Sequence, residues 1–185
     1  MTKDVVIGFD LSLSAPAAVA LPLDWRPGDW KRVRTWTIKP MAPANDDLRG
    51  QLERYDTIVD WAVGCTYEIQ TSGDVFGYVE DYAFSKSITS TSRLRESGGA
   101  VKLALYQRCE LVLTPVPASE ARKRVLGFSP RKPANDPKVT VQRFCFDAGA
   151  PKTWSEDVCD AFIVAQYGLS ELGGKILALP PTQKG

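Results

Sequence analysis

The sequence predicts a mixed α/β fold, in which helices pack on a sheet that has both antiparallel and parallel strand neighbours. Three short strand-like segments come first, and helical segments then alternate with further strand-like segments. A strand, a crossover helix and a following strand place the two strands side by side in one direction. The 185-residue length fits one domain with a full-sized core, expected over residues 1–172, with a C-terminal tail at 173–185.

The first half of the predicted sheet is antiparallel. The apolar run 4–10 is typical of a buried strand. Residues 15–21 and 32–39 follow as its expected partners, because 32–39 alternates in polarity and a Pro-Gly turn lies between the two segments.

The second half of the predicted sheet is parallel, because helical segments separate its strands. The expected order is helix, strand, helix, strand, over residues 45–67, 74–80, 89–109 and 110–116. Asn45 or Asp46 is expected to cap the first of these helices. The second is expected to be interrupted, or to start late, near Gly98-Gly99.

Three helical segments are expected after the last strand, at 117–127, 137–149 and 153–172. The last of them is the clearest. Thr153 and Glu156 have the spacing of a capping box. Its apolar residues then fall on one face, at Val158, Ala161, Phe162 and Ala165.

The composition excludes several kinds of chemistry. The chain contains no histidine, so catalytic triads, imidazole proton transfer and His-ligated zinc are excluded. Its four cysteines are scattered, which argues against a zinc site or a disulfide framework and favours a reducing cytoplasm. No apolar run is long enough to cross a membrane.

Four carboxylates occupy positions at which a site could form. Asp10 ends the first predicted strand and Glu80 ends the fourth, so parallel pairing would place both at the sheet edge where α/β folds bind ligands. Asp157 and Asp160 are three residues apart and share one face of the last helix. Ordinary explanations stay open: a turn at Asp10, a strand-end charge at Glu80, and helix-dipole acids at the other two.

Taken together, the four acids indicate a cation site, because carboxylates gathered in one place repel each other. Oxygen ligands without His or Cys select Mg²⁺ or Mn²⁺. Two such ions about 4 Å apart can clamp a phosphodiester and activate water. The sequence therefore predicts two ions per active site and a hydrolase that acts on nucleic acid.

The chain also resembles the RuvC family of Holliday-junction resolvases, within the ribonuclease H-like superfamily. The resemblance lies in five segments in the family's order, at 5–19, 77–87, 97–105, 121–144 and 155–168. It implies a ribonuclease H-like mixed five-stranded sheet flanked by helices. It also implies metal ligands and a catalytic lysine, which would be Asp10, Glu80, Asp157, Asp160 and Lys138.

The chain departs from the family pattern at several places. Arg122 stands where the family carries another functional lysine, and Asp10-Leu11-Ser12 replaces the usual D-P-G. The loop between Gly127 and Lys138 is longer than usual. These departures suggest a divergent, phage-encoded branch.

The resemblance implies DNA contacts outside the acids. An aromatic residue that follows the second acid wedges into the junction in the family, so Tyr82 and Phe84 are candidates, although either could instead cap the core. The basic segment 120–138 is a possible phosphate-binding surface or an ordinary solvated one. The phosphate-contact candidates are Lys86, Arg93, Arg95, Arg122, Lys123, Arg124, Arg131 and Lys132.

The predicted function is a metal-dependent endonuclease that resolves four-way DNA junctions as a homodimer in the cytoplasm of a bacterial or phage-infected cell. Alternatives keep the chemistry and change the substrate to flaps, forks or RNA–DNA hybrids. A non-catalytic junction-binding module is a further alternative. A sugar-kinase-like ATPase, whose first strand ends similarly, would need a second domain for which 185 residues leave no room.

Overall fold

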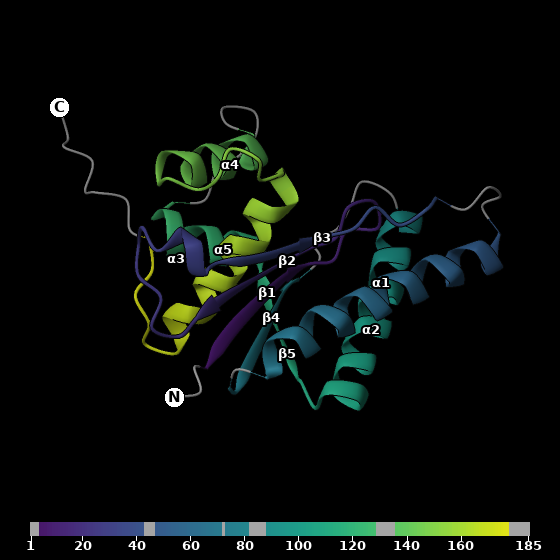
Figure 1. Ribbon diagram of the computed structural model, residues 1–185. Coiled ribbons are helices and arrows are strands. Elements are labelled where there is room, and N and C mark those ends of the chain that lie inside the picture. The colour runs from purple at the N-terminus through teal and green to yellow at the C-terminus, as the bar shows by residue number, and fades with distance from the viewer. Residues whose placement is uncertain (1–3, 43–46, 72, 82–87, 129–135, 178–185) are drawn as a thin grey trace.

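The structure is a computed structural model, and it describes residues 4–42, 47–71, 73–81, 88–128 and 136–177. A five-stranded sheet at its centre has the order β3-β2-β1-β4-β5 (Figure 1). Strand β2 (Ala17–Pro22) pairs antiparallel with both of its neighbours, β1 (Val5–Asp10) and β3 (Arg34–Thr37). Strand β4 (Val75–Asp81) pairs parallel with both of its neighbours, β1 and β5 (Leu113–Pro117). The predicted mixed sheet is therefore confirmed.

Helices cover both faces of the sheet (Figure 1). The helices α1 (Leu48–Gln70) and α2 (Ile88–Cys109) lie on one face, whereas α3 (Ala118–Leu126), α4 (Pro137–Asp147) and α5 (Glu156–Glu171) lie on the other. A single-turn 3-10 helix, η1 (Trp30–Arg32), precedes β3. Within the described residues, no helix combines the length and the apolar character that crossing a membrane requires.

Strand β1 separates two apolar cores because its side chains alternate between the faces of the sheet. Val6 packs in the core beneath α5, while Ile7 and Phe9 pack in the core beneath α1 and α2. All three side chains are fully buried.

The cap of helix α1 differs from the predicted ones. Helix α1 is capped by Asp47, whose carboxylate accepts a hydrogen bond from the Gly50 N–H at 2.8 Å. The predicted caps Asn45 and Asp46 lie outside the described residues.

Helix α2 runs without a break from Ile88 to Cys109, so the expected interruption at Gly98-Gly99 was wrong. Ser97 and Gly98 are buried in the packed structure. Tertiary packing of the helix therefore overrides the weak local propensity of the two glycines.

Helix α5 is capped by Ser155, whose hydroxyl accepts a hydrogen bond from the Val158 N–H at 3.3 Å. The predicted capping box of Thr153 and Glu156 was therefore wrong, because Glu156 is the first helical residue and cannot reach back as the third one would. Asp157 consequently lies in the first turn of the helix.

Helix α5 lies unusually close to β1 at Gly8. A Cβ atom at Gly8 would be 2.4 Å from the Ala165 backbone nitrogen and 2.5 Å from the Ala161 carbonyl oxygen. Asp10 is two residues further along the strand and so faces the same side. The close approach at Gly8 therefore brings the end of β1 up to the first turns of α5.

Candidate active site

The four predicted acids come from three elements that meet at the carboxyl edge of the parallel strands. Strands β1 and β4 pair Phe9 with Val79, so the next residues, Asp10 and Glu80, follow on neighbouring strands about 4.8 Å apart. Both face α5, as do Gly8 and Tyr78 two residues earlier.

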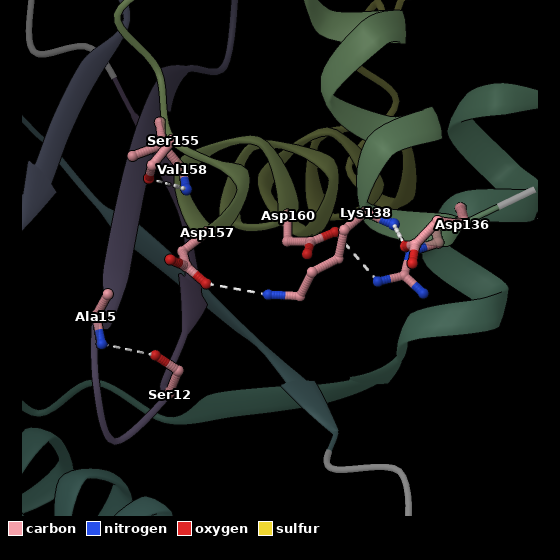
Figure 2. Close-up of polar contacts among 9 residues, drawn as sticks. Ser12, Ala15, Asp136, Lys138, Ser155, Asp157, Val158 and Asp160 are labelled. Carbon is pink, nitrogen blue, oxygen red and sulfur yellow. Dashed lines mark hydrogen bonds and ion pairs between the residues drawn. The ribbon is translucent and has the colours of Figure 1, made fainter.

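Two acids on α5 complete the group. The Ser155 cap starts the helix so that Asp157 and Asp160, three residues apart, project from one face toward the sheet edge. In Figure 2 both carboxylates point into the space that the Lys138 side chain enters from α4. The structure thus brings together the five residues predicted as metal-binding or catalytic.

Two cations contact the acids directly. The Arg122 guanidinium donates a hydrogen bond to Asp160 Oδ1 at 3.1 Å, and Lys138 Nζ lies 3.3 Å from Asp157 Oδ1. The first pair is the more buried, with side-chain exposures of 15% for Arg122 and 3% for Asp160. Arg122 therefore neutralises an otherwise buried charge.

Lys138 enters the site because α4 starts one residue before it. Asp136 caps the helix by accepting a hydrogen bond from the Lys138 N–H at 3.0 Å, and Pro137 occupies the first helical turn. This start points the lysine side chain across to α5 (Figure 2).

The acids perturb one another strongly. Burial raises the pKa of Asp10 well above its usual value, and Glu80, Asp160 and Asp157 raise it further, against the opposing effect of Lys138. Burial and Asp160 likewise raise the pKa of Glu80 to about 7. Burial raises the pKa of Asp160 despite its contact with Arg122. The protein therefore holds negative charge here at a cost in stability.

The charged form of Lys138, unlike that of the acids, is stabilised by the site. Burial alone lowers the pKa of Lys138, but the carboxylates of Asp157, Asp10 and Asp160 outweigh that effect, and the net shift is upward. Lys138 therefore remains a cation under all ordinary conditions.

The donor chemistry fits a hard divalent cation, because four carboxylates converge without any sulfur or imidazole ligand. Among the described residues, no three acidic side chains stand ready as a preassembled metal site. Arg122 and Lys138 hold two of the four carboxylates instead. Ion binding would therefore require Asp157 to turn from Lys138 toward the metal, whereas Asp160 keeps a second carboxylate oxygen, Oδ2, outside its bond to Arg122.

The other predicted contacts are distributed as follows. Tyr82, Phe84, Lys86, Arg131 and Lys132 lie outside the described residues. Arg93 and Arg95 belong to the first turns of α2, which begins soon after Glu80.

The two exposed basic residues of α3 differ in their contacts. Lys123 and Arg124 are both exposed, but Arg124 also pairs with Glu171 at 2.9 Å and lies over the ring of Tyr167. The internal ion pair of Arg122 had no local signal in the sequence, because Arg122 and Asp160 are 38 residues apart.

Solved structures share this fold. The chain matches no protein-family model and no curated protein. A structure of Thermus thermophilus RuvC in complex with a Holliday junction substrate is similar to it, with a TM-score of 0.65, 17% identity, and coverage of 94% of this chain and 99% of that one. A second Thermus thermophilus RuvC structure has a TM-score of 0.63, 14% identity and the same coverage. The predicted ribonuclease H-like fold of RuvC is confirmed.

Proposed function

We propose that the chain is a divalent-metal-dependent endonuclease that cuts four-way DNA junctions. The observation that carries the proposal is the convergence of four carboxylates and Lys138 at one edge of the sheet. The fold is shared with a RuvC protein whose structure holds a Holliday junction substrate, which supports branched DNA as the substrate class.

The acids would hold the cations. When bound, Mg²⁺ or Mn²⁺, two ions per site in our proposal, would neutralise the carboxylates and supply the activated water and charge stabilisation that phosphodiester hydrolysis needs. Asp10, Glu80, Asp157 and Asp160 would be the ligands, and their mutual repulsion favours taking up such ions.

Lys138 would serve the reacting phosphate. Its side chain is about half exposed, 49% by area, so the ammonium is accessible from solvent while it rests on Asp157. Once Asp157 turns away, Lys138 is free to donate to a phosphate oxygen and stabilise the charge that develops there. Arg122, being buried, would hold Asp160 in place.

We also propose that the enzyme acts as a homodimer. A four-way junction is resolved by cutting two strands, and one active site per chain requires two copies for paired cuts. The setting we propose is cytoplasmic, since all four cysteines are free thiols.

The proposal is tested by incubating the protein with a labelled four-way junction, a flap, a replication fork and an RNA–DNA hybrid, each with Mg²⁺, Mn²⁺ or EDTA. Paired symmetric nicks in the junction, which need a divalent ion, are expected. Cleavage confined to flaps, forks or hybrids would replace the junction as the substrate.

Two variants separate chemistry from binding. Asp157→Asn should keep junction binding in a gel-shift assay and lose cleavage, because the ligand charge is removed and the side-chain shape is kept. Asp147→Asn is the matched control, since Asp147 is exposed and pairs with Arg143 one turn earlier on α4. Junction binding without any cleavage by the wild-type protein would point to a non-catalytic module.

A further inference from the structure

A pocket of about 360 Å³ lies between the edge strand β3 and the segment that leads into α5, on the face of the sheet that carries α5 and Asp10. None of the residues that line it is charged. Its lining combines aromatic with hydroxyl side chains, chiefly Trp30, Trp154, Thr35, Thr37, Thr153 and Ser155. We refer to it as the tryptophan pocket. This lining suits a flat, uncharged group with hydrogen-bonding edges better than a phosphate.

The pocket lies in the same row of the sheet as the acids. Thr37 pairs with Ala17, and Ala17 pairs with Asp10, so the three residues form one line across β3, β2 and β1. With neighbouring strands about 4.8 Å apart, Thr37 is about 10 Å from Asp10 along this line. The pocket is thus within reach of a nucleotide next to a phosphodiester held at the acids.

The start of helix α5 also links the tryptophan pocket to the acids. Ser155 lines the pocket and caps the helix, and Asp157 follows two residues later. Figure 2 shows Ser155 and Asp157 on successive parts of the same helix start, with Asp157 turned toward Lys138. A strand that crossed the acids could therefore place its next base against the start of α5.

The polar groups of the pocket are available to a ligand. Thr35, Thr37 and Thr153 are exposed, and within the part of the chain that the structure describes their hydroxyls bond to no other residue. Trp30 is partly exposed and packs edge-on against Trp154, with ring centroids 5.8 Å apart. The two rings form a rigid apolar floor, so a bound base would order few side chains.

We propose that the tryptophan pocket binds one unpaired nucleobase of the cleaved strand, next to the scissile phosphate. This inference rests on the proposed nuclease function and adds to it a site that selects an unstacked nucleotide. Contact between an aromatic side chain and a base is sequence-tolerant, because every base has a π-face. Branched DNA, whose strands exchange at one point, offers such bases more readily than an intact duplex does.

The test has two arms: tyrosine substitutions that fill the pocket in the protein, and abasic nucleotides that remove the base from the DNA. Thr35→Tyr and Thr37→Tyr fill the pocket from an exposed strand position that tolerates an aromatic residue. Thr114→Tyr makes the same change at an exposed position on the opposite edge strand, β5, and is the matched control. Each variant is compared with wild type by its thermal melt and by its kcat/KM on a four-way junction. A second junction is abasic at the nucleotides that flank the cut.

The expected losses follow from base stacking, which contributes 1–3 kcal/mol per base and so changes kcat/KM by about 5- to 150-fold. Thr35→Tyr should lower kcat/KM on the intact junction by this factor, and the abasic junction should lower the wild-type value similarly. The two losses should not multiply, because both remove the same contact. If the abasic junction lowers kcat/KM of Thr35→Tyr as much again as it lowers that of wild type, the proposal is overturned. It is also overturned if both Thr35→Tyr and Thr37→Tyr keep the wild-type kcat/KM.

A second measurement is independent of cleavage. A single-stranded oligonucleotide that carries 5-iododeoxyuridine is irradiated with the protein in EDTA, and the cross-linked peptides are mapped. Cross-links to Trp30 or Trp154 that Thr35→Tyr abolishes would support the pocket, and cross-links only elsewhere would refute it. If wild-type protein cuts no branched DNA, the proposed function fails, and this measurement alone decides about the pocket.

Discussion

Glu80→Gln is expected to stabilise the metal-free protein at neutral pH while it abolishes metal-dependent cleavage. Glu80 is partly buried next to Asp10 and Asp160, and its pKa rises from 4.5 to about 7 on folding. One pKa unit corresponds to 1.36 kcal/mol, so the ionised carboxylate costs the folded state about 3 kcal/mol above pH 7. Glutamine keeps the shape of the side chain and carries no charge.

The sign and the pH window follow from proton uptake. Below pH 4.5 the carboxyl is protonated in both states, so glutamate and glutamine should behave alike. Between pH 4.5 and about 7 the unfolded chain has lost this proton and the folded chain still holds it, so wild-type stability falls as pH rises. The advantage of Glu80→Gln should be under about 1 kcal/mol at pH 5 and about 3 kcal/mol at pH 8.

The assay is thermal unfolding in EDTA from pH 5 to pH 8.5. For a chain of this length, about 3 kcal/mol corresponds to a rise in Tm of about 6–12 °C at pH 8. With Mg²⁺ in place of EDTA, the Tm of wild type should exceed that of Glu80→Gln, because only the wild-type site binds the ion well. Glu53→Gln, at an exposed position on α1, is the control and should change Tm little at any pH. A Tm gain that is absent, or equal at pH 5 and pH 8, would refute the electrostatic reasoning.

Three further changes test the packing and the cations of the site. Arg122→Ala should cost about 3 kcal/mol in urea unfolding at pH 8, because it leaves Asp160 buried and unpaired. The loss should shrink as the pH is lowered, because burial raises the pKa of Asp160, and also in an Asp160→Asn background; an equal loss in that background would show that the charge is irrelevant. Lys138→Ala should slow single-turnover cleavage about 100-fold and leave the fold intact. The exposed Lys175→Ala is its control, and equal rates for the two variants would remove Lys138 from the reaction. Gly8→Ala should destabilise by about 3 kcal/mol in urea unfolding, because its Cβ would collide with the α5 backbone. Gly99→Ala, at a helical glycine with open space around it, should instead stabilise slightly, and a loss like that of Gly8→Ala would argue against the close packing.

Most of the fold could be predicted from the sequence because its signals are local. The apolar run at 5–10, the alternation at 34–37 and the three- and four-residue spacing in α1 each report on the faces of one element. The errors occurred at helix boundaries. Ser155 outcompeted Thr153 as the cap of α5, and α2 continued through Gly98, because both outcomes depend on how the helix packs.

The acids were predictable as a group because strand ends can be located from sequence, and parallel strands bring their carboxyl ends to one edge. The sequence by itself determined that Asp10 and Glu80 lie at or next to the ends of two strands and that two aspartates share one face of α5. The absence of histidine also restricted the chemistry to oxygen ligands and cations.

Only the tertiary structure decided which residues and which pocket surround the four acids. The pairing of Arg122 with Asp160, the contact of α5 with Gly8, and the tryptophan pocket between β3 and α5 each join segments that are far apart in the chain. Such contacts depend on which atoms meet once the layers close, and close packing makes that sensitive to single atoms. Local patterns specify which face of an element is buried, but they do not specify its partner across the core.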